Sequence, residues 1–266
     1  MWELILQAIC EAEGERFHRA GNAQSVSGGC INQASVLKLI DEAGRPKQFF
    51  VKVNTAPVVE QFSAEAEGLD ELRRPEAIRV PRPVCHGMAE DAGFLVLEYV
   101  DLGGGRTSKR EAQLGKQLAD LHRTLATDRQ FGWIRDNAIG ATPQVNTQTS
   151  DWLEFFVDHR LRVQFGLAKR KGAHFSEVDA FLDQVVPSIL SEHRPSASLL
   201  HGDLWGGNVG YDEDGHPVVF DPAVYFGDRE TDLAFTHMFG GFGPAFYQSY
   251  ERAWPLPAGH QLRSEL

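Results

Sequence analysis

The sequence predicts an α+β fold with two lobes: a small antiparallel β-sheet lobe that carries one main helix, and a larger, mostly helical lobe. Short β-type runs dominate residues 22–100, one helical pattern interrupts them, and helical patterns take over after the glycines of DLGGG. We place the boundary between residues 1–100 and 101–266, with a hinge near residues 100–105. A ligand site is expected in the crevice between the lobes.

The first residues, MWELILQAICEAEGE, predict an amphipathic helix and not a signal peptide, because acids are mixed into the apolar positions and no basic segment precedes them. Glycine-bearing turns separate four β-type runs, which are NAQSVSG, INQASVLKLID, KQFFVKV and GFLVLEYV. The interrupting helix, APVVEQFSAEAEGLDELRR, has apolar residues at helical spacing and ends before Pro75. The second lobe holds three helical segments: SKREAQLGKQLADLHRTLA, SDWLEFFVDHRLRVQFGLAKR and SEVDAFLDQVVPSILSEH.

Composition narrows the possible partners. The 266 residues include 26 Lys and Arg against 37 Asp and Glu, a formal net charge of −11. Without a basic run, this charge disfavours a nucleic-acid partner and an anionic membrane surface. No apolar stretch approaches the roughly 18 residues of a membrane span. The cysteines at positions 10, 30 and 85 have neither disulfide nor zinc spacing, so we expect a cytoplasmic protein.

The segment HGDLWGGN, residues 201–208, holds an acid and an amide five positions apart in a glycine-rich loop. Asp203 is placed to receive the proton of an attacking hydroxyl, and Asn208 to offer its amide oxygen to a metal ion. The spacing matches the kinase catalytic loop H-R-D-x-x-x-x-N, with Gly202 in the Arg position. Asp221 follows 18 residues after Asp203, so Asn208 and Asp221 are predicted Mg²⁺ ligands. The alternative is a turn in which Asp203 and Asn208 only satisfy local backbone groups.

Lys52 lies inside the apolar strand FFVKVN, where a cation is costly unless it is paired or holds a ligand. Glu65, on the following helix, is its expected partner, and the pair would place Lys52 against nucleotide phosphates. Glu67 could replace Glu65, but the two point about 200° apart around the helix, so only one can face the strand. A lysine of an edge strand whose ammonium reaches water is the other interpretation.

Two further segments are candidates for nucleotide contacts. Gly28 and Gly29 of SVSGGCIN separate two β runs ahead of the Lys52 strand, and their backbone N–H groups could approach phosphate oxygens. A plain hairpin turn is the alternative. The strand FLVLEYV ends at the lobe junction, so the backbone from Glu98 to Val100 is placed to bind adenine. The predicted cofactors are therefore ATP and Mg²⁺.

Together these residues resemble the kinase-like phosphotransferases, which include aminoglycoside and choline kinases and share HGDxxxxN and a later Asp. Within them the chain resembles the fructosamine kinase (ketosamine 3-kinase) family over nearly its whole length. The resemblance rests on FFVKVN, AEAEGL, RVPRP, LVLEY, LHR, DNAIGATPQVN, LLHGDLWGGN, FDPAVYFGDRETDLA and FGGFGPAFY.

The resemblance implies a two-lobed protein-kinase-like fold and ATP-dependent phosphorylation of the 3-hydroxyl of a ketosamine. A ketosamine is the sugar adduct of an amine, and the phosphorylated adduct becomes unstable and releases the amine. The implied partners are free ribulosamines, erythrulosamines or fructosamines and glycated proteins. Residues 1–100 would then form the nucleotide-binding lobe, and residues 101–266 the catalytic and substrate lobe.

The resemblance also implies residue roles. Asp203 would be the general base, and Asn208 and Asp221 would hold Mg²⁺. Lys52, together with Glu65, would orient the phosphates.

Other residues of the motifs are expected to support the site. His201 would brace the loop by hydrogen bonding. Asp228 and Asp232 are candidates for helix-start caps, and one of them for a buttress of the catalytic loop. Trp205 is a candidate wall of the sugar pocket, with simple packing as the alternative. The family suggests a substrate-facing role for two further parts: residues 136–146 and Trp152.

Two features depart from the family pattern. Cys30 stands in the glycine loop where bacterial relatives usually carry Asp, although some eukaryotic members have Cys there. A thiol near phosphates could oxidise and block ATP, or pair with Cys30 of another subunit. A buried, inert cysteine is the alternative. The family also continues with a further C-terminal helix, whereas this sequence stops at HQLRSEL.

Two other functions remain open. One is a kinase for another small hydroxyl compound, such as an amino sugar or amino alcohol. The other is a nucleotide-binding regulator without turnover. The regulator is disfavoured because the four residues that chemistry needs are all present: Lys52, Asp203, Asn208 and Asp221.

Overall fold

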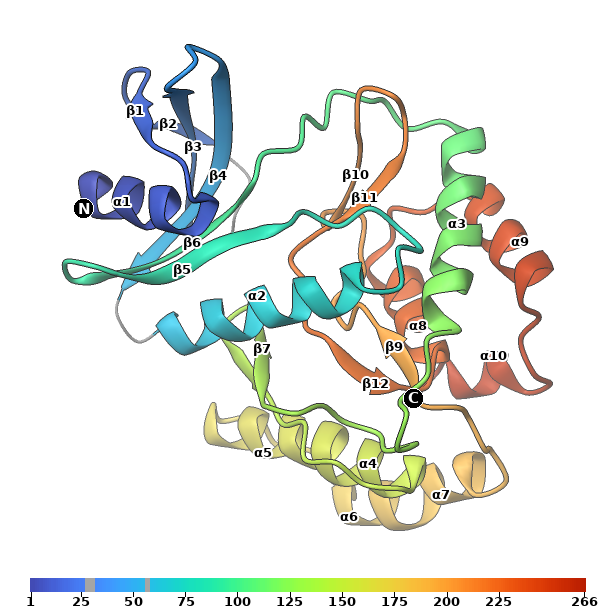
Figure 1. Ribbon diagram of the computed structural model, residues 1–266. Coiled ribbons are helices and arrows are strands. Elements are labelled where there is room, and N and C mark those ends of the chain that lie inside the picture. The colour runs from blue at the N-terminus through green and yellow to red at the C-terminus, as the bar shows by residue number, and fades with distance from the viewer. Residues whose placement is uncertain (27–31, 56–57) are drawn as a thin grey trace.

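The computed structural model describes residues 1–26, 32–55 and 58–266 and has the predicted two lobes (Figure 1). The small lobe is built on a six-stranded antiparallel sheet in the order β1-β3-β4-β6-β5, with β2 paired to β3. Its strands are β1 (Phe17–Arg19), β2 (Gln24–Val26), β3 (Gln33–Asp41), β4 (Pro46–Thr55), β5 (Pro83–Ala89) and β6 (Ala92–Glu98). The predicted phosphate-loop glycines and the redox cysteine lie outside the described residues: Gly28, Gly29 and Cys30.

Two helices cover opposite faces of this sheet. α1 (Trp2–Glu13) packs on the face that carries Val51, and α2 (Val59–Arg73) packs on the face that carries Leu95. Lys52 follows Val51 along β4 and is paired with Leu95 of β6. Because successive strand residues point to opposite faces, Lys52 points toward α2 and not toward α1.

The large lobe contains the three predicted helical segments. They are α3 (Ser108–His122), which packs along α9 (Pro244–Ala253); α4 (Trp152–Phe156), continued through a π-helical turn at Val157–Leu161 into α5 (Arg162–Arg170); and α6 (Val178–Ala180), continued through Phe181–Val185 into α7 (Val186–Leu190). α8 (Glu230–Phe239) and α10 (His260–Arg263) complete the helices of the described ranges. Within those ranges, none of the helices is long and apolar enough to cross a membrane.

Three short two-stranded sheets place loops at the lobe junction. They are β7 (Asn137–Ile139) with β8 (Thr142–Gln144), β9 (Ser198–Leu200) with β12 (Tyr225–Gly227), and β10 (Val209–Tyr211) with β11 (Pro217–Val219). The HGDLWGGN loop runs from β9 to β10, and Asp221 lies two residues after the end of β11. The sheets therefore carry both halves of the predicted catalytic motif to one region.

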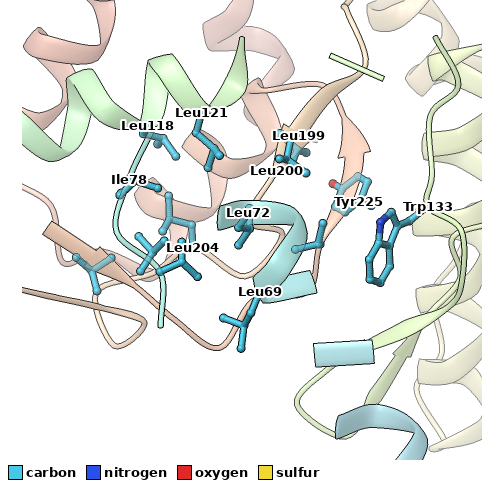
Figure 2. Close-up of a cluster of buried hydrophobic side chains, with 14 of the residues drawn as sticks. Leu69, Leu72, Ile78, Leu118, Leu121, Trp133, Leu199, Leu200, Leu204 and Tyr225 are labelled. Atoms are coloured by element: carbon cyan, nitrogen blue, oxygen red, sulfur yellow. The ribbon is translucent and has the colours of Figure 1, made fainter. Parts of the chain in front are cut away.

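The lobes share a hydrophobic core. Leu69 and Leu72 of α2 belong to the same buried cluster as Leu118 and Leu121 of α3 and Leu200 of β9, and Figure 2 shows these side chains around one centre. α2 is therefore packed against the sheet and against the large lobe at once. The boundary at residues 100/101, which rests on the change in sequence pattern, stays a prediction.

A close contact between the inter-lobe linker and the large lobe explains one glycine of DLGGG. The Gly104 N–H donates to the Tyr211 carbonyl oxygen (3.0 Å), and a Cβ on Gly104 would clash with the carbonyl oxygens of Tyr211 and Asp212. Glycine is needed there because the linker approaches the β10–β11 hairpin closely. At this point the predicted hinge is attached to the large lobe.

Candidate active site

A cavity of about 490 Å³ lies between the lobes and is lined by both. The small lobe contributes parts of β4 and α2, and the large lobe contributes the loop after β9 and the residues after β11. Every predicted site residue within the described ranges lines this cavity: Lys52, Glu65, Glu98, Val100, Asp203, Asn208 and Asp221.

Lys52 is buried and doubly paired. Its Nζ donates to Glu65 Oε1 and to Asp221 Oδ1, both at 2.6 Å. Burial alone would lower the pKa of Lys52, but the two carboxylates outweigh it and raise that pKa above its ordinary value. Lys52 therefore stays an ammonium and joins α2 to the large lobe.

The choice between the two acids of α2 is settled by the geometry. Glu65 binds Lys52, whereas Glu67 Oε1 accepts from Arg135 Nη1 (2.7 Å) on the far side of the helix. The expectation that only one of them can face the strand is confirmed, and that one is Glu65. Lys52 is 5% exposed, so the interpretation as a lysine that reaches water is wrong.

The loop after β9 holds its acid and its amide side by side. Asn208 Nδ2 donates to the Asp203 carbonyl oxygen (2.8 Å) and to Asp203 Oδ2 (3.1 Å). Gly202 has a φ of 79°, and a Cβ there would clash with the Ala223 carbonyl oxygen. The loop thus needs glycine immediately before Asp203, both for its left-handed backbone and for its close approach to the segment after β11.

Asp203 has the electrostatics of a proton acceptor that works near neutral pH. Burial raises the pKa of Asp203 to about 6; the Asn208 hydrogen bond opposes this, and Asp221 adds to it. A carboxylate with this pKa is ionised at pH 7 and is still basic enough to take a proton from a hydroxyl group as that group attacks.

Two side chains suit a divalent cation. Because the Asn208 amide nitrogen is bound to Asp203, the amide oxygen is the Asn208 atom that remains for a cation. Asp221 directs one oxygen to Lys52, and its side chain, which lines the cavity, is 43% exposed. A carboxylate and an amide oxygen, completed by water and phosphate oxygens, are the donors that Mg²⁺ takes in phosphotransferases. The donor set therefore fits Mg²⁺.

Asp232 supports the loop from behind. Its buried carboxylate accepts from the backbone N–H of His201 (2.8 Å) and of Gly202 (2.9 Å), and it pairs with His122 Nε2 (3.2 Å). Burial would raise the pKa of Asp232, but the His122 hydrogen bond and the backbone donors lower it overall. The predicted buttress is thus confirmed as Asp232. Asp228 instead accepts from the Glu230 N–H (3.1 Å), although the residue at the N-cap position of α8 is Arg229.

His201 braces the loop, as predicted. Its Nε2 pairs with the Phe220 carbonyl oxygen (3.0 Å), and its Nδ1 accepts from the Asp203 N–H (3.3 Å). Burial lowers the pKa of His201, which favours the neutral ring that this donor and acceptor pattern needs. Both ring nitrogens are occupied by backbone groups, so His201 positions Asp203.

The structure shortens the stretch of backbone that is available for the predicted adenine contact. The Glu98 N–H donates to the Arg82 carbonyl oxygen (2.9 Å), so this donor is occupied within the sheet. Glu98 and Val100 line the cavity together with Tyr99. The backbone after the Glu98 nitrogen stays the candidate for an adenine contact.

Of the residues predicted to face the substrate, several line the cavity and one does not. Trp205 and three residues of the β7–β8 hairpin line the cavity, namely Asn137, Ala138 and Gly140. Trp152 is 5% exposed and packs against Phe131 and Phe155 with ring centres 5.3 and 5.8 Å apart. The suggestion that Trp152 faces substrate is therefore wrong, because its ring fills an aromatic cluster in the large lobe.

Some contacts of the site were missed from the sequence. The Lys52–Asp221 pair joins residues 169 positions apart, and no local pattern specifies it. His122 lies in the LHR motif, yet its link to Asp232 depends on the packing of α3 and α8. Arg135, which binds Glu67, directly precedes the DNAIGATPQVN motif.

A two-lobed fold whose cleft holds a Lys–Glu pair, an Asp and Asn loop and a second Asp defines a protein-kinase-like phosphotransferase. The family model described as fructosamine kinase matches residues 1–266. The chain belongs to the fructosamine kinase family and is an ATP-dependent kinase.

Relatives and a solved structure agree with this membership. A protein of Synechocystis sp. named as a probable ketoamine kinase is 43% identical over 265 residues, which cover 100% of this chain and 87% of the relative. The chloroplastic protein-ribulosamine 3-kinase of Arabidopsis thaliana is 38% identical over 246 residues, 91% of this chain and 73% of the relative. A Haemophilus somnus crystal structure, provisionally described as a fructosamine-3-kinase, has a TM-score of 0.89 at 31% identity and covers 99% of this chain and 86% of its own.

Proposed function

We propose that this chain transfers the terminal phosphoryl group of ATP to the 3-hydroxyl of a ketosamine. One observation carries the proposal: Lys52, Asp203, Asn208 and Asp221 converge on one cavity in a chain that is 43% identical, along its whole length, to a protein named as a probable ketoamine kinase. The acceptor would be a ribulosamine, erythrulosamine or fructosamine, free or on a glycated protein. Release of the amine would make this a deglycation reaction, placed in the cytoplasm.

Each site residue has its own role in the proposed phosphoryl transfer. Asp203 takes the proton of the acceptor hydroxyl, and Asn208 holds the Asp203 carboxylate in place through its amide N–H. Lys52, aligned by Glu65, binds nucleotide phosphates, while the backbone from Tyr99 to Val100 contacts adenine. Mg²⁺, held by Asn208 and Asp221, would neutralise charge on the phosphates.

The experiment measures ATP consumption with Mg²⁺ against ribuloselysine, fructoselysine and an aminoglycoside. Wild type is compared with Asp203→Asn, which should lose roughly 10²- to 10⁴-fold in rate because the base is gone. Asp214→Asn is the matched control, since Asp214 is an exposed acid in the β10–β11 turn. Turnover of only the aminoglycoside would overturn the ketosamine assignment and leave a kinase of another amino sugar.

A further inference from the structure

Arg135 joins the large lobe to α2 of the small lobe. Its Nη1 donates to Glu67 Oε1 (2.7 Å) and Ser63 Oγ (3.0 Å). Its Nη2 donates to Glu60 Oε2 (2.9 Å) and to the Glu60 carbonyl oxygen (3.3 Å). One guanidinium therefore holds four acceptors on a single helix, which its planar, two-armed geometry suits.

These acceptors lie on the side of α2 away from Lys52. Glu60, Ser63 and Glu67 recur at positions i, i+3 and i+7, which places them on one face of the helix. Glu65 points about 200° away from Glu67 and binds Lys52. Arg135 and Lys52 therefore hold α2 from opposite sides, and a rotation of the helix about its axis would break one set of contacts or the other.

The main chain around Arg135 is held by hydrogen bonds within the large lobe. The Arg135 carbonyl oxygen accepts from Asn146 Nδ2 (3.1 Å), and Asn137 Nδ2 donates to the Val224 carbonyl oxygen (2.8 Å). Asn137 begins β7, and the β7–β8 hairpin lines the cavity. β7 lies beside α2 (Figure 1). Arg135 thus links the cavity-lining hairpin to the helix that aligns Lys52.

We infer that Arg135 is a positioning residue that couples acceptor binding at the β7–β8 hairpin to ATP binding at Lys52. The inference rests on the proposed function, which places the acceptor beside the hairpin and the phosphates at Lys52. An acceptor that orders the hairpin also orders Arg135, which through α2 keeps Glu65 on Lys52. By linkage, ATP must then tighten acceptor binding by the same factor.

Exposure limits the size of this coupling. The side chains of Arg135, Glu67 and Glu60 are 27%, 41% and 86% exposed. Exposed ion pairs are individually weak, whereas a network on one guanidinium is stronger than a single pair. We therefore expect removal of Arg135 to change the coupling by about three- to tenfold, within the range known for residues that link two sites.

The test measures the dissociation constant of Mg²⁺ with a non-hydrolysable ATP analogue by calorimetry, with and without saturating ribuloselysine. Wild type should bind the analogue about three- to tenfold more tightly with ribuloselysine, and Arg135→Ala should remove this difference. Arg135→Lys keeps the charge without the two-armed geometry and should restore part of it. Glu67→Gln should weaken the coupling alone and add little to Arg135→Ala, because both act through one contact.

Arg162→Ala is the matched control. Arg162 also binds two carboxylates, Asp158 (3.1 Å) and Asp183 (3.3 Å), but both lie in the helices of the large lobe. This variant should keep the wild-type coupling. If the coupling depended only on general packing, both arginine variants would lower it. Thermal unfolding of each variant shows whether its packing has been weakened.

The outcomes separate the two proposals. A wild type that does not phosphorylate ribuloselysine, fructoselysine or another ketosamine overturns the proposed function. A wild type that turns over a ketosamine, yet binds the analogue equally with and without it, overturns the coupling alone. A folded Arg135→Ala variant that keeps the full coupling also overturns the coupling proposal and leaves the proposed function intact.

Discussion

At the scale of single residues, the environment of Asp203 sets a pH range for catalysis. Because burial raises the pKa of Asp203 to about 6, its carboxylate is ionised above that pH and protonated below it. A general base must be ionised, so kcat/KM for the acceptor should be level above pH 7 and fall about tenfold per pH unit once the pH is well below the pKa of Asp203. A pH–rate profile from 4.5 to 8 at saturating MgATP measures this.

The control for this profile is Asp214→Asn, which removes an exposed carboxylate outside the cavity and should keep the wild-type curve. The residual rate of Asp203→Asn should not show the acid limb, because its side chain does not titrate. An Asp203→Asn profile with the same acid limb as wild type would contradict the role of Asp203.

The same scale shows what sequence can specify about a site. Asp203 and Asn208 are five residues apart in one loop, so the sequence itself predicts that both lie in one catalytic loop, where they are in contact. Glu65 is the expected partner of Lys52, whereas helical geometry predicts only that Glu65 and Glu67 cannot both face the strand. The pairing of Lys52 with Asp221 and of His122 with Asp232 depends on how distant elements pack, so the residue pattern carried no signal for it.

At the scale of elements, close helix packing rests on a glycine in α3. A Cβ on Gly115 would clash with the Phe246 carbonyl oxygen of α9. Gly115→Ala gains up to about 1 kcal/mol of helix propensity but loses about 1–3 kcal/mol by overpacking, so we expect net destabilisation. Urea denaturation measures the change in the free energy of unfolding.

Gly166 of α5 provides the opposite case. The nearest atom to a Cβ built there is Arg170 Nη1 at 3.8 Å, the end of a flexible side chain. Gly166→Ala should therefore stabilise the protein by up to about 1 kcal/mol, since only the propensity changes. If Gly115→Ala also stabilises the protein, close approach between α3 and α9 is not what Gly115 provides.

Helices and strands with a clear apolar periodicity are predicted from the sequence, whereas short elements or elements with a weak apolar pattern are not. β3, β4, β6, α1, α2 and α3 all follow apolar patterns that the sequence displays. β5 was missed because prolines precede it, its residues include Cys85, His86 and Gly87, and it lies at the sheet edge, where one neighbouring strand supplies its hydrogen bonds. β1 is only three residues long, and the π-helical turn at Val157–Leu161 has no pattern that distinguishes it from α-helix.

At the scale of the whole molecule, one ion pair in the cavity joins the two lobes. Lys52 comes from the small lobe, Asp221 from the large lobe, and the two are 2.6 Å apart across the cavity. The shared core around α2 also joins the lobes, so this ion pair is a further link between them. The two-lobe division was visible in the sequence, whereas a core common to both lobes was not, because it combines residues from distant segments.

The Lys52–Asp221 pair predicts how nucleotide and metal bind. A cation that uses Asp221 must compete with the Lys52 ammonium, whereas ATP phosphates give that ammonium new acceptors. Mg²⁺ alone should therefore leave Tm nearly unchanged, while MgATP at about 100 times its Kd should raise Tm by roughly 5–10 °C. Lys52→Met should narrow the difference between the two shifts, because it frees Asp221 for Mg²⁺ and removes a phosphate contact. Thermal unfolding with Mg²⁺, with ATP plus a chelator and with both together tests this, and an equal shift from Mg²⁺ alone and from MgATP in wild type would contradict the competition.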